Sequence, residues 1–215
     1  MQLSLWWTLV GAGFLISLTP GAGAVNTMAN SLEAGWRRSL WGVLGQQAAL
    51  LVHVVIVALG LGFLVATNHW LFLAIRLVGA AYLVWLGVRL WLARPDTAAP
   101  DAAEQAATEA TEPGHLRPWA MFRRGLLVNL TNPKAIVFFL ALTPQFIRLD
   151  RPMLQQYLVF GLTLVAIDII VMWFFFAVAA KGLRRFIRDE SGQRVLNRIF
   201  GTLFVAVGGL LAVIE

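Results

Sequence analysis

The chain has 215 residues, of which 59% are hydrophobic and 13% carry a charge, and its mean hydropathy is +0.75. A soluble globular domain has about 25% charged residues, so most of this chain must face lipid or other apolar helices. Cysteine is absent, which excludes disulfide frameworks and thiolate metal sites. The net charge of +6 does not indicate a nucleic-acid partner, because the basic residues are placed as in the loops of a membrane protein.

Hydropathy predicts six membrane-spanning helices, because the hydrocarbon core takes about 20 apolar residues per helix. They are expected at residues 4–28, 40–66, 70–92, 122–147, 153–180 and 197–214. The first is expected to be a retained span, because no basic stretch precedes it. Residues 94–119 are rich in Ala, Thr, Pro and acids and lack apolar periodicity, which predicts a polar linker between residues 1–93 and 120–215. The expected fold is an all-α polytopic membrane protein.

Lys and Arg are distributed unevenly between the two sides of the predicted bundle. One side has only Arg148 and Arg151. The other side holds Arg37, Arg38, Arg89, Arg94, Arg117, Arg123, Arg124, Lys181, Arg184, Arg185, Arg188, Arg194 and Arg198. Because cytoplasmic loops are enriched in basic residues, this pattern predicts a cytoplasmic linker and two periplasmic termini.

Two of the predicted spans carry similar helix-breaking motifs, Leu18–Gly23 (LTPGAG) and Leu130–Lys134 (LTNPK). Proline removes a backbone donor and clashes with the preceding turn, and glycine adds conformational freedom. A broken helix in a membrane must line protein or water, because unpaired backbone groups are costly in lipid. A pair of broken spans, one in each half, predicts the binding site of a transporter. The half-helices after Pro20 and Pro133 also expose N-terminal amides, which suit a substrate carboxylate.

The third and sixth spans share an arginine, two glycines and an aromatic residue at equal offsets: Arg76, Gly79, Tyr82 and Gly87 against Arg198, Gly201, Phe204 and Gly209. Small residues at such offsets also let helices pack closely, either within one chain or in a homodimer. Together with the two break motifs, the match predicts two three-helix halves of opposite orientation, an inverted 3+3 repeat.

Several polar residues lie deep in the predicted spans. Asp168 is the acid at the centre of the fifth span, and intramembrane acids commonly bind substrate or carry protons, although a structural pairing is the alternative. His53 in the second span is either a proton carrier or an interhelical hydrogen-bond donor. Gln46 lies seven residues before His53 on the same helix face, so it is a candidate cavity residue. Lys134 is expected to hold an anionic substrate group or to pair with Asp168.

At these residues the chain resembles the LysE/RhtB family of bacterial amino-acid exporters, along nearly its whole length except the linker. The resemblance rests on Ser17–Met28, Gly79–Gly87, Asn129–Lys134 and Pro144–Ile147. It implies a secondary exporter of small amino acids or their derivatives in the bacterial inner membrane, driven by the proton-motive force. The chain is most similar to the homoserine/homoserine lactone branch, although Ala22 and Gly23 replace the Pro-Asn common in the family's first span.

The expected substrate site comprises residues at both breaks and on the second span: Pro20, Gly21, Gly23, Asn26, Gln46, Asn132, Pro133 and Lys134. Asp168, together with His53, is expected to carry the coupling proton. The expected partners are therefore a small amino acid, protons and the lipid bilayer, with no cofactor. An intramembrane enzyme is disfavoured, because a zinc site needs three or four protein ligands and the spans hold one deep His and one deep acid. A leucine or basic-amino-acid exporter and a passive channel remain alternatives.

Overall fold

The computed structural model describes residues 3–67, 69–93, 116–148, 150–182 and 189–213, and these residues are helical apart from short connections. In chain order the helices are α1 (Leu3–Leu18), α2 (Ala22–Ala34), α3 (Trp36–Thr67), α4 (His69–Leu92), α6 (Pro118–Leu130), α7 (Pro133–Phe146), α8 (Met153–Ile169), the π-helix η1 (Ile170–Phe176) and α10 (Glu190–Val213). The predicted linker, residues 94–119, lies outside the described residues apart from its last four.

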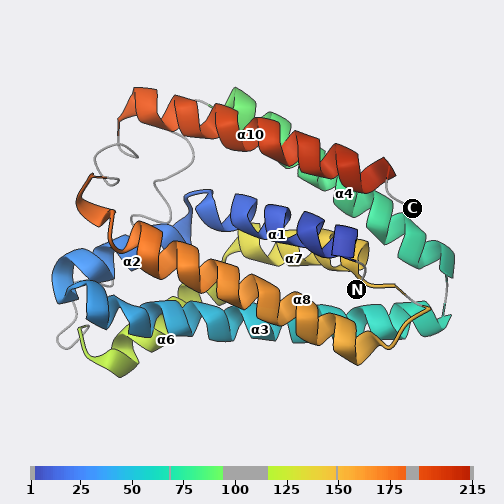
Figure 1. The fold of residues 1–215 in the computed structure, drawn as a ribbon, viewed down its shortest axis with the longest axis horizontal. Coiled ribbons are helices and arrows are strands. Elements are labelled where there is room, and N and C mark those ends of the chain that lie inside the picture. Colours follow the sequence, from blue (N-terminus) through green and yellow to red (C-terminus); the bar gives the residue numbers. More distant parts are fainter. Residues whose placement is uncertain (1–2, 68, 94–115, 149, 183–188, 214–215) are drawn as a thin grey trace.

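α1 and α7 lie in the middle of the bundle, with α4 and α10 side by side along one flank (Figure 1). α3 and α8 lie along the other flank, where α8 contacts both α1 and α3. α7 contacts α4 on one side and α3 on the other. The start of α1 and the end of α10 lie at one end of the bundle, opposite the end at which α2 and α6 lie.

The structure confirms that both proline motifs break their helices. α1 and α2 meet at an angle of 59°, and α6 and α7 meet at 58°. The first interruption contains Pro20, and the second places Pro133 at the first position of α7, where its missing N–H costs no helical hydrogen bond. The sequence-based boundaries were less accurate, because α2 continues to Ala34 rather than ending at residue 28. α10 likewise begins at Glu190 rather than at residue 197.

The helices support a polytopic membrane protein. Within the described residues, α3, α4 and the continuous α8–η1 segment are each long and apolar enough to cross a membrane. Each bent pair also passes that test when it is taken as one span, which gives up to five candidate spans. Within the described residues, α10 is not among these candidates.

Glycines allow two helix pairs to approach until their backbones touch. A Cβ atom on Gly45 of α3 would collide with the backbone of Phe122 on α6, and one on Gly125 would collide with Gly42. In the α4–α10 pair, a Cβ on Gly87 would lie 2.6 Å from the carbonyl oxygen of Gly201, and the converse distance is also 2.6 Å. Such small-residue contacts are the usual way in which helices associate in lipid.

The matching glycines of α4 and α10 are not used symmetrically. A strict two-fold relation would pair Gly79 with Gly209, as Gly87 pairs with Gly201. Gly79 instead packs against Ala141 of α7, and a Cβ on Gly209 would meet nothing within 4 Å. α4 therefore packs against α7 at this point rather than against α10.

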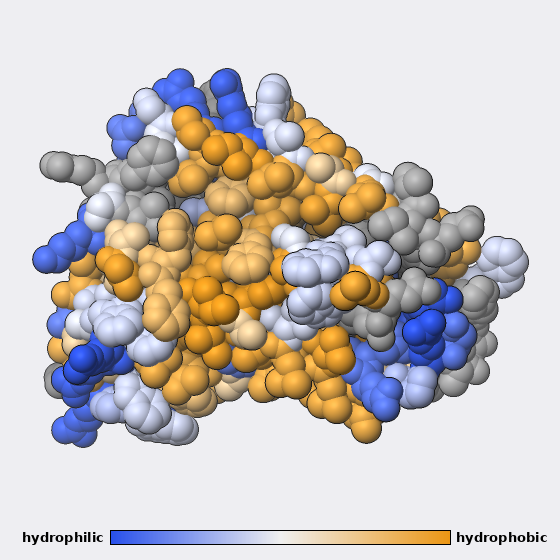
Figure 2. Space-filling model, in the orientation of Figure 1, coloured by the Kyte–Doolittle hydropathy of each residue, from blue (hydrophilic) through white to orange (hydrophobic). Residues whose placement is uncertain are grey.

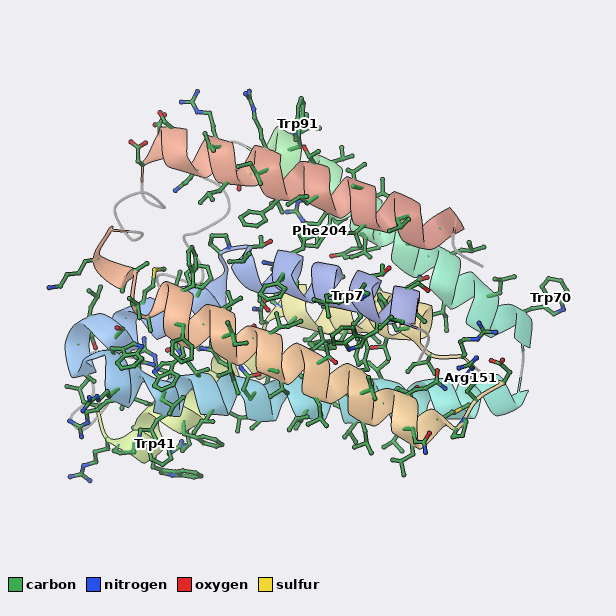
Figure 3. All side chains as sticks on the ribbon, in the orientation of Figure 1. Trp7, Trp41, Trp70, Trp91, Arg151 and Phe204 are labelled. Carbon is green, nitrogen blue, oxygen red and sulfur yellow. The ribbon has the colours of Figure 1, made fainter. Side chains whose placement is uncertain are left out.

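The surface has the pattern of a membrane protein. An apolar region covers the middle of the visible face, and hydrophilic residues lie towards its two ends (Figure 2). Trp70 and Arg151 lie at one end of the bundle and Trp41 lies towards the other (Figure 3). Trp70 and Trp41 are 76% and 45% exposed, as expected for aromatic residues at the two membrane interfaces.

Candidate functional site

The two breaks lie on the wall of one cavity. Its lining residues come from α1, α2, α3, α6, α7, α8 and η1 and from the two interruptions: Ile16, Ser17, Thr19, Gly21, Gly23, Ala24, Gln46, Leu50, Asn129, Asn132, Lys134, Ala135, Phe138, Phe139, Leu164, Asp168 and Met172. Among these described lining residues, Lys134 is the one cation and Asp168 is the one acid.

Lys134 reaches from the second break to the first. Asn132 caps α7 by accepting a hydrogen bond from the Lys134 backbone N–H at 3.0 Å, which fixes the start of the helix. The Lys134 ammonium then donates to the carbonyl oxygen of Thr19 at 3.0 Å. This carbonyl belongs to the interruption that Pro20 causes, so the cation from one break satisfies a backbone group that the other break frees.

Asp168 is held by two neutral donors from other helices. The hydroxyl of Ser17 on α1 donates to one carboxylate oxygen at 2.8 Å. The amide of Gln47 on α3 donates to the other oxygen at 2.7 Å. Asp168 lies two residues before the π-helix η1, and π-helical turns frequently occur at functional sites.

Gln46 joins the first break to α3. Its side-chain amide donates to the carbonyl oxygen of Gly23 at 3.1 Å and to the hydroxyl of Thr27 at 3.0 Å. The amide of Asn129 on α6 donates to the Gln46 backbone carbonyl at 3.0 Å. A Cβ on Gly23 would lie 3.1 Å from Oε1 of Gln46, so glycine at this position allows the close approach of α2 and α3.

His53 contacts the second break from outside the lining of the cavity. Its Nε2 atom lies 3.3 Å from the carbonyl oxygen of Leu130, and its ring stacks on Phe139 with centroids 5.6 Å apart. A carbonyl only accepts hydrogen bonds, so this contact requires His53 to donate from Nε2. The contact satisfies a carbonyl at the end of α6.

The structure brings together five of the predicted substrate residues, namely Gly21, Gly23, Gln46, Asn132 and Lys134, at one cavity with Asp168. Pro20 and Pro133 shape the two interruptions but do not line the cavity. Asn26 is fully buried on α2 and faces Gly42 of α3, away from the cavity lining. Neither polar atom of the Asn26 amide has a hydrogen-bond partner among the described residues.

Sequence reasoning missed Ser17, Thr19 and Gln47. Gln47 directly follows Gln46 in the sequence, and its side-chain amide donates to Asp168. Ser17 and Thr19 directly precede Pro20, so their position beside the break was the available signal. No sequence pattern indicated that Asp168 would face Ser17, because that contact depends on how α1 and α8 pack.

Comparison with known proteins gives consistent matches. The family model described as "LysE type translocator" matches residues 14–214. A homoserine/homoserine lactone efflux protein of Salmonella typhimurium is 40% identical over 212 residues, which cover 99% of this chain and 98% of that protein. An uncharacterised membrane protein of Vibrio cholerae is 42% identical over 213 residues, with the same coverage. One of Bacillus subtilis is 32% identical over 197 residues, 90% of this chain and 91% of its own. No solved structure matches the chain.

Proposed function

This chain belongs to the family of LysE type translocators, and from that membership we propose that it exports homoserine and homoserine lactone from the bacterial cytoplasm. It is a membrane transporter of the amino-acid exporter family and not an enzyme. The choice of substrate is supported by the 40% identity, over nearly the whole chain, to efflux proteins named for these two compounds.

The observation that carries the proposal is the cavity between the two helix breaks. It lies between helices of both halves of the chain, and its described lining residues include one cation, Lys134, and one acid, Asp168. Breaks in paired spans are where secondary transporters bind their substrates. A single acid among the lining residues also favours a neutral amino acid over a basic one, since a basic substrate would bring two cationic groups to one carboxylate.

The membrane topology is part of the proposal. Six crossings, in two inverted halves of three, would place both termini on one side, as the positions of the chain ends in Figure 1 support. The nearly equal bends of 59° and 58° at the start of each half also support the repeat. The uneven distribution of Lys and Arg favours periplasmic termini and a cytoplasmic linker.

We assign the coupling proton to Asp168. It is the one acid on the cavity wall among the described residues, and a carboxylate inside a membrane protein is the usual proton carrier of a transporter. The sequence also predicts His53 as a second carrier. We assign it a structural role instead, because its ring nitrogen contacts the Leu130 carbonyl at the second break.

Uptake of labelled homoserine and its lactone into energised inside-out vesicles tests this function. We expect saturable uptake that stops when the proton gradient is collapsed. Uptake that continues at the same rate without the gradient would refute the antiport. Uptake of both compounds that does not saturate would indicate a channel, and failure to take up either compound would refute the substrate assignment.

A further inference from the structure

We propose that the cavity recognises an amino acid by its two charged ends, which bind at separate places. The carboxylate would bind where Lys134 meets the N-terminus of α2, and the ammonium would bind to Asp168 in competition with the coupling proton. This inference rests on the proposed export of homoserine and its lactone. It assigns each end of the substrate to named groups and explains how one site serves both compounds.

The first pole is the start of α2. Gly21 is the N-cap residue and offers no side-chain hydrogen bond to the first turn of the helix. Helix N-termini carry partial positive charge and unpaired N–H groups, which favour an anion. Gly21 and Gly23 line the cavity, so this end of the helix lies at the substrate's position.

A cation lies at this same point. A Cβ atom on Gly21 would be only 3.7 Å from the Lys134 ammonium nitrogen. A cation at a helix N-terminus is repelled by the helix dipole unless an anion lies nearby. The ammonium has three N–H donors, and one of them is directed to the Thr19 carbonyl. A substrate carboxylate at this position would accept from Lys134 and from the first turn of α2.

The second pole is Asp168. Its two hydrogen-bond donors, Ser17 and Gln47, are neutral, and a carboxylate has about four sites that accept hydrogen bonds. The Lys134 ammonium, on α7, donates to Thr19 instead of to Asp168, although both charges line one cavity. A substrate ammonium would therefore supply a charge-assisted hydrogen bond to this carboxylate.

Proton and substrate would exclude one another at Asp168. α1 contributes Ser17 and α3 contributes Gln47 around the carboxylate, and neither side chain titrates in the physiological range. Lys134 of α7 is the charged group that acts on Asp168 across the cavity, while His53 of α3 faces Leu130. When Asp168 binds a proton it loses the negative charge that attracts an ammonium. Binding of a proton to Asp168 would therefore favour release of the substrate, which couples the two movements.

The two compounds should consequently differ in their dependence on Lys134. Homoserine has both a carboxylate and an ammonium, whereas its lactone keeps the ammonium and has no carboxylate. Both therefore require Asp168, and only homoserine requires Lys134. Loss of one charge-assisted contact corresponds to a change of about ten- to hundredfold in apparent affinity.

Transport of both compounds by purified variants in proteoliposomes tests this assignment. We expect Lys134→Gln to raise the KM for homoserine about ten- to hundredfold and to change that for the lactone less than about threefold. Asp168→Asn should abolish gradient-driven transport of both. Lys181→Gln and Glu190→Gln, which alter exposed charges outside the cavity, should resemble the wild type.

A second measurement separates recognition from folding. With equal pH on both sides, lowering the pH should raise the wild-type KM for both compounds. In Lys134→Arg, which keeps the cation, homoserine transport should be largely restored. Equal losses of homoserine and lactone transport in Lys134→Gln, or a KM that does not change with pH, would overturn the two-pole site. If the wild type transported neither compound, the proposed function itself would fail.

Discussion

The break between α1 and α2 and the break between α6 and α7 bend their helices by 59° and 58°, but the protein treats their freed backbone groups differently. At the second break, Asn132 caps α7 and His53 lies at the carbonyl of Leu130. At the first break, α2 has no side-chain cap. The Thr19 carbonyl, which follows the end of α1, accepts a hydrogen bond from the Lys134 ammonium. The second interruption thus has a side-chain cap that fixes the start of α7 at Lys134, whereas the first leaves the start of α2 without a side-chain cap.

The largest effect should come from capping the first break. Gly21 has an extended backbone with φ −161°, and a Cβ there would meet only Lys134 at ordinary contact distances of 3.7 and 3.8 Å. Gly21→Asp should therefore be accommodated. Its carboxylate would cap α2, pair with Lys134 and occupy the place proposed for the substrate carboxylate. We expect homoserine transport to fall at least about a hundredfold, while the cap stabilises the protein by ~1 kcal/mol.

Transport and thermal unfolding in detergent micelles measure these two effects together. Gly21→Ala is the matched control, because it adds the Cβ without the carboxylate. A Gly21→Asp protein that transports homoserine at the wild-type rate would show that the first break is not the carboxylate site.

The contrast between the breaks also shows what sequence could predict. The motifs around Pro20 and Pro133 predicted both interruptions correctly, because proline's missing donor acts locally. Lys134 and Asp168 do line one cavity, but the Lys134 ammonium donates to the Thr19 carbonyl, and its binding of a substrate anion stays a prediction. The contact between Ser17 and Asp168 and the π-helix after α8 could not be predicted, since both depend on packing between distant segments. Asn26 was expected at the site but does not line the cavity, and its amide lies next to Gly42 of α3.

The next largest effect concerns His53, which should stabilise the second break rather than carry a proton. His53→Leu removes the donor to the Leu130 carbonyl and should destabilise the protein by ~1 kcal/mol. His53→Gln keeps an amide donor and should unfold nearer to the wild-type temperature, with proton-driven transport retained. Thermal unfolding and vesicle uptake are the measurements. A well-folded His53→Gln protein that lost coupling to the gradient would make His53 a proton carrier.

Removal of the second cap should destabilise the protein, whereas Gly21→Asp should stabilise it. Asn132→Ala takes away the side-chain oxygen that accepts from the Lys134 backbone N–H, which should destabilise the protein by ~1 kcal/mol. Because the cap also positions Lys134, the KM for homoserine should rise more than the KM for the lactone. Asn132→Ser, which retains a capping oxygen, serves as the control. Unchanged unfolding temperatures in Asn132→Ala would mean that the second break does not depend on its cap.

The smallest expected effect is a difference in stability between substitutions at two matched threonines, one at each break. Thr19 and Thr131 each donate a side-chain hydrogen bond to the carbonyl four residues earlier, at 2.6 and 2.8 Å. Thr19 is 5% exposed and its carbonyl binds Lys134, whereas Thr131 is exposed. Thr19→Val should cost ~1 kcal/mol, because valine leaves the buried Leu15 carbonyl with one donor fewer. Thr131→Val should change stability by less than ~0.5 kcal/mol, as exposed substitutions usually do. Equal changes in the unfolding temperatures of the two variants would mean that the two breaks are supported alike, contrary to the difference in their hydrogen bonds.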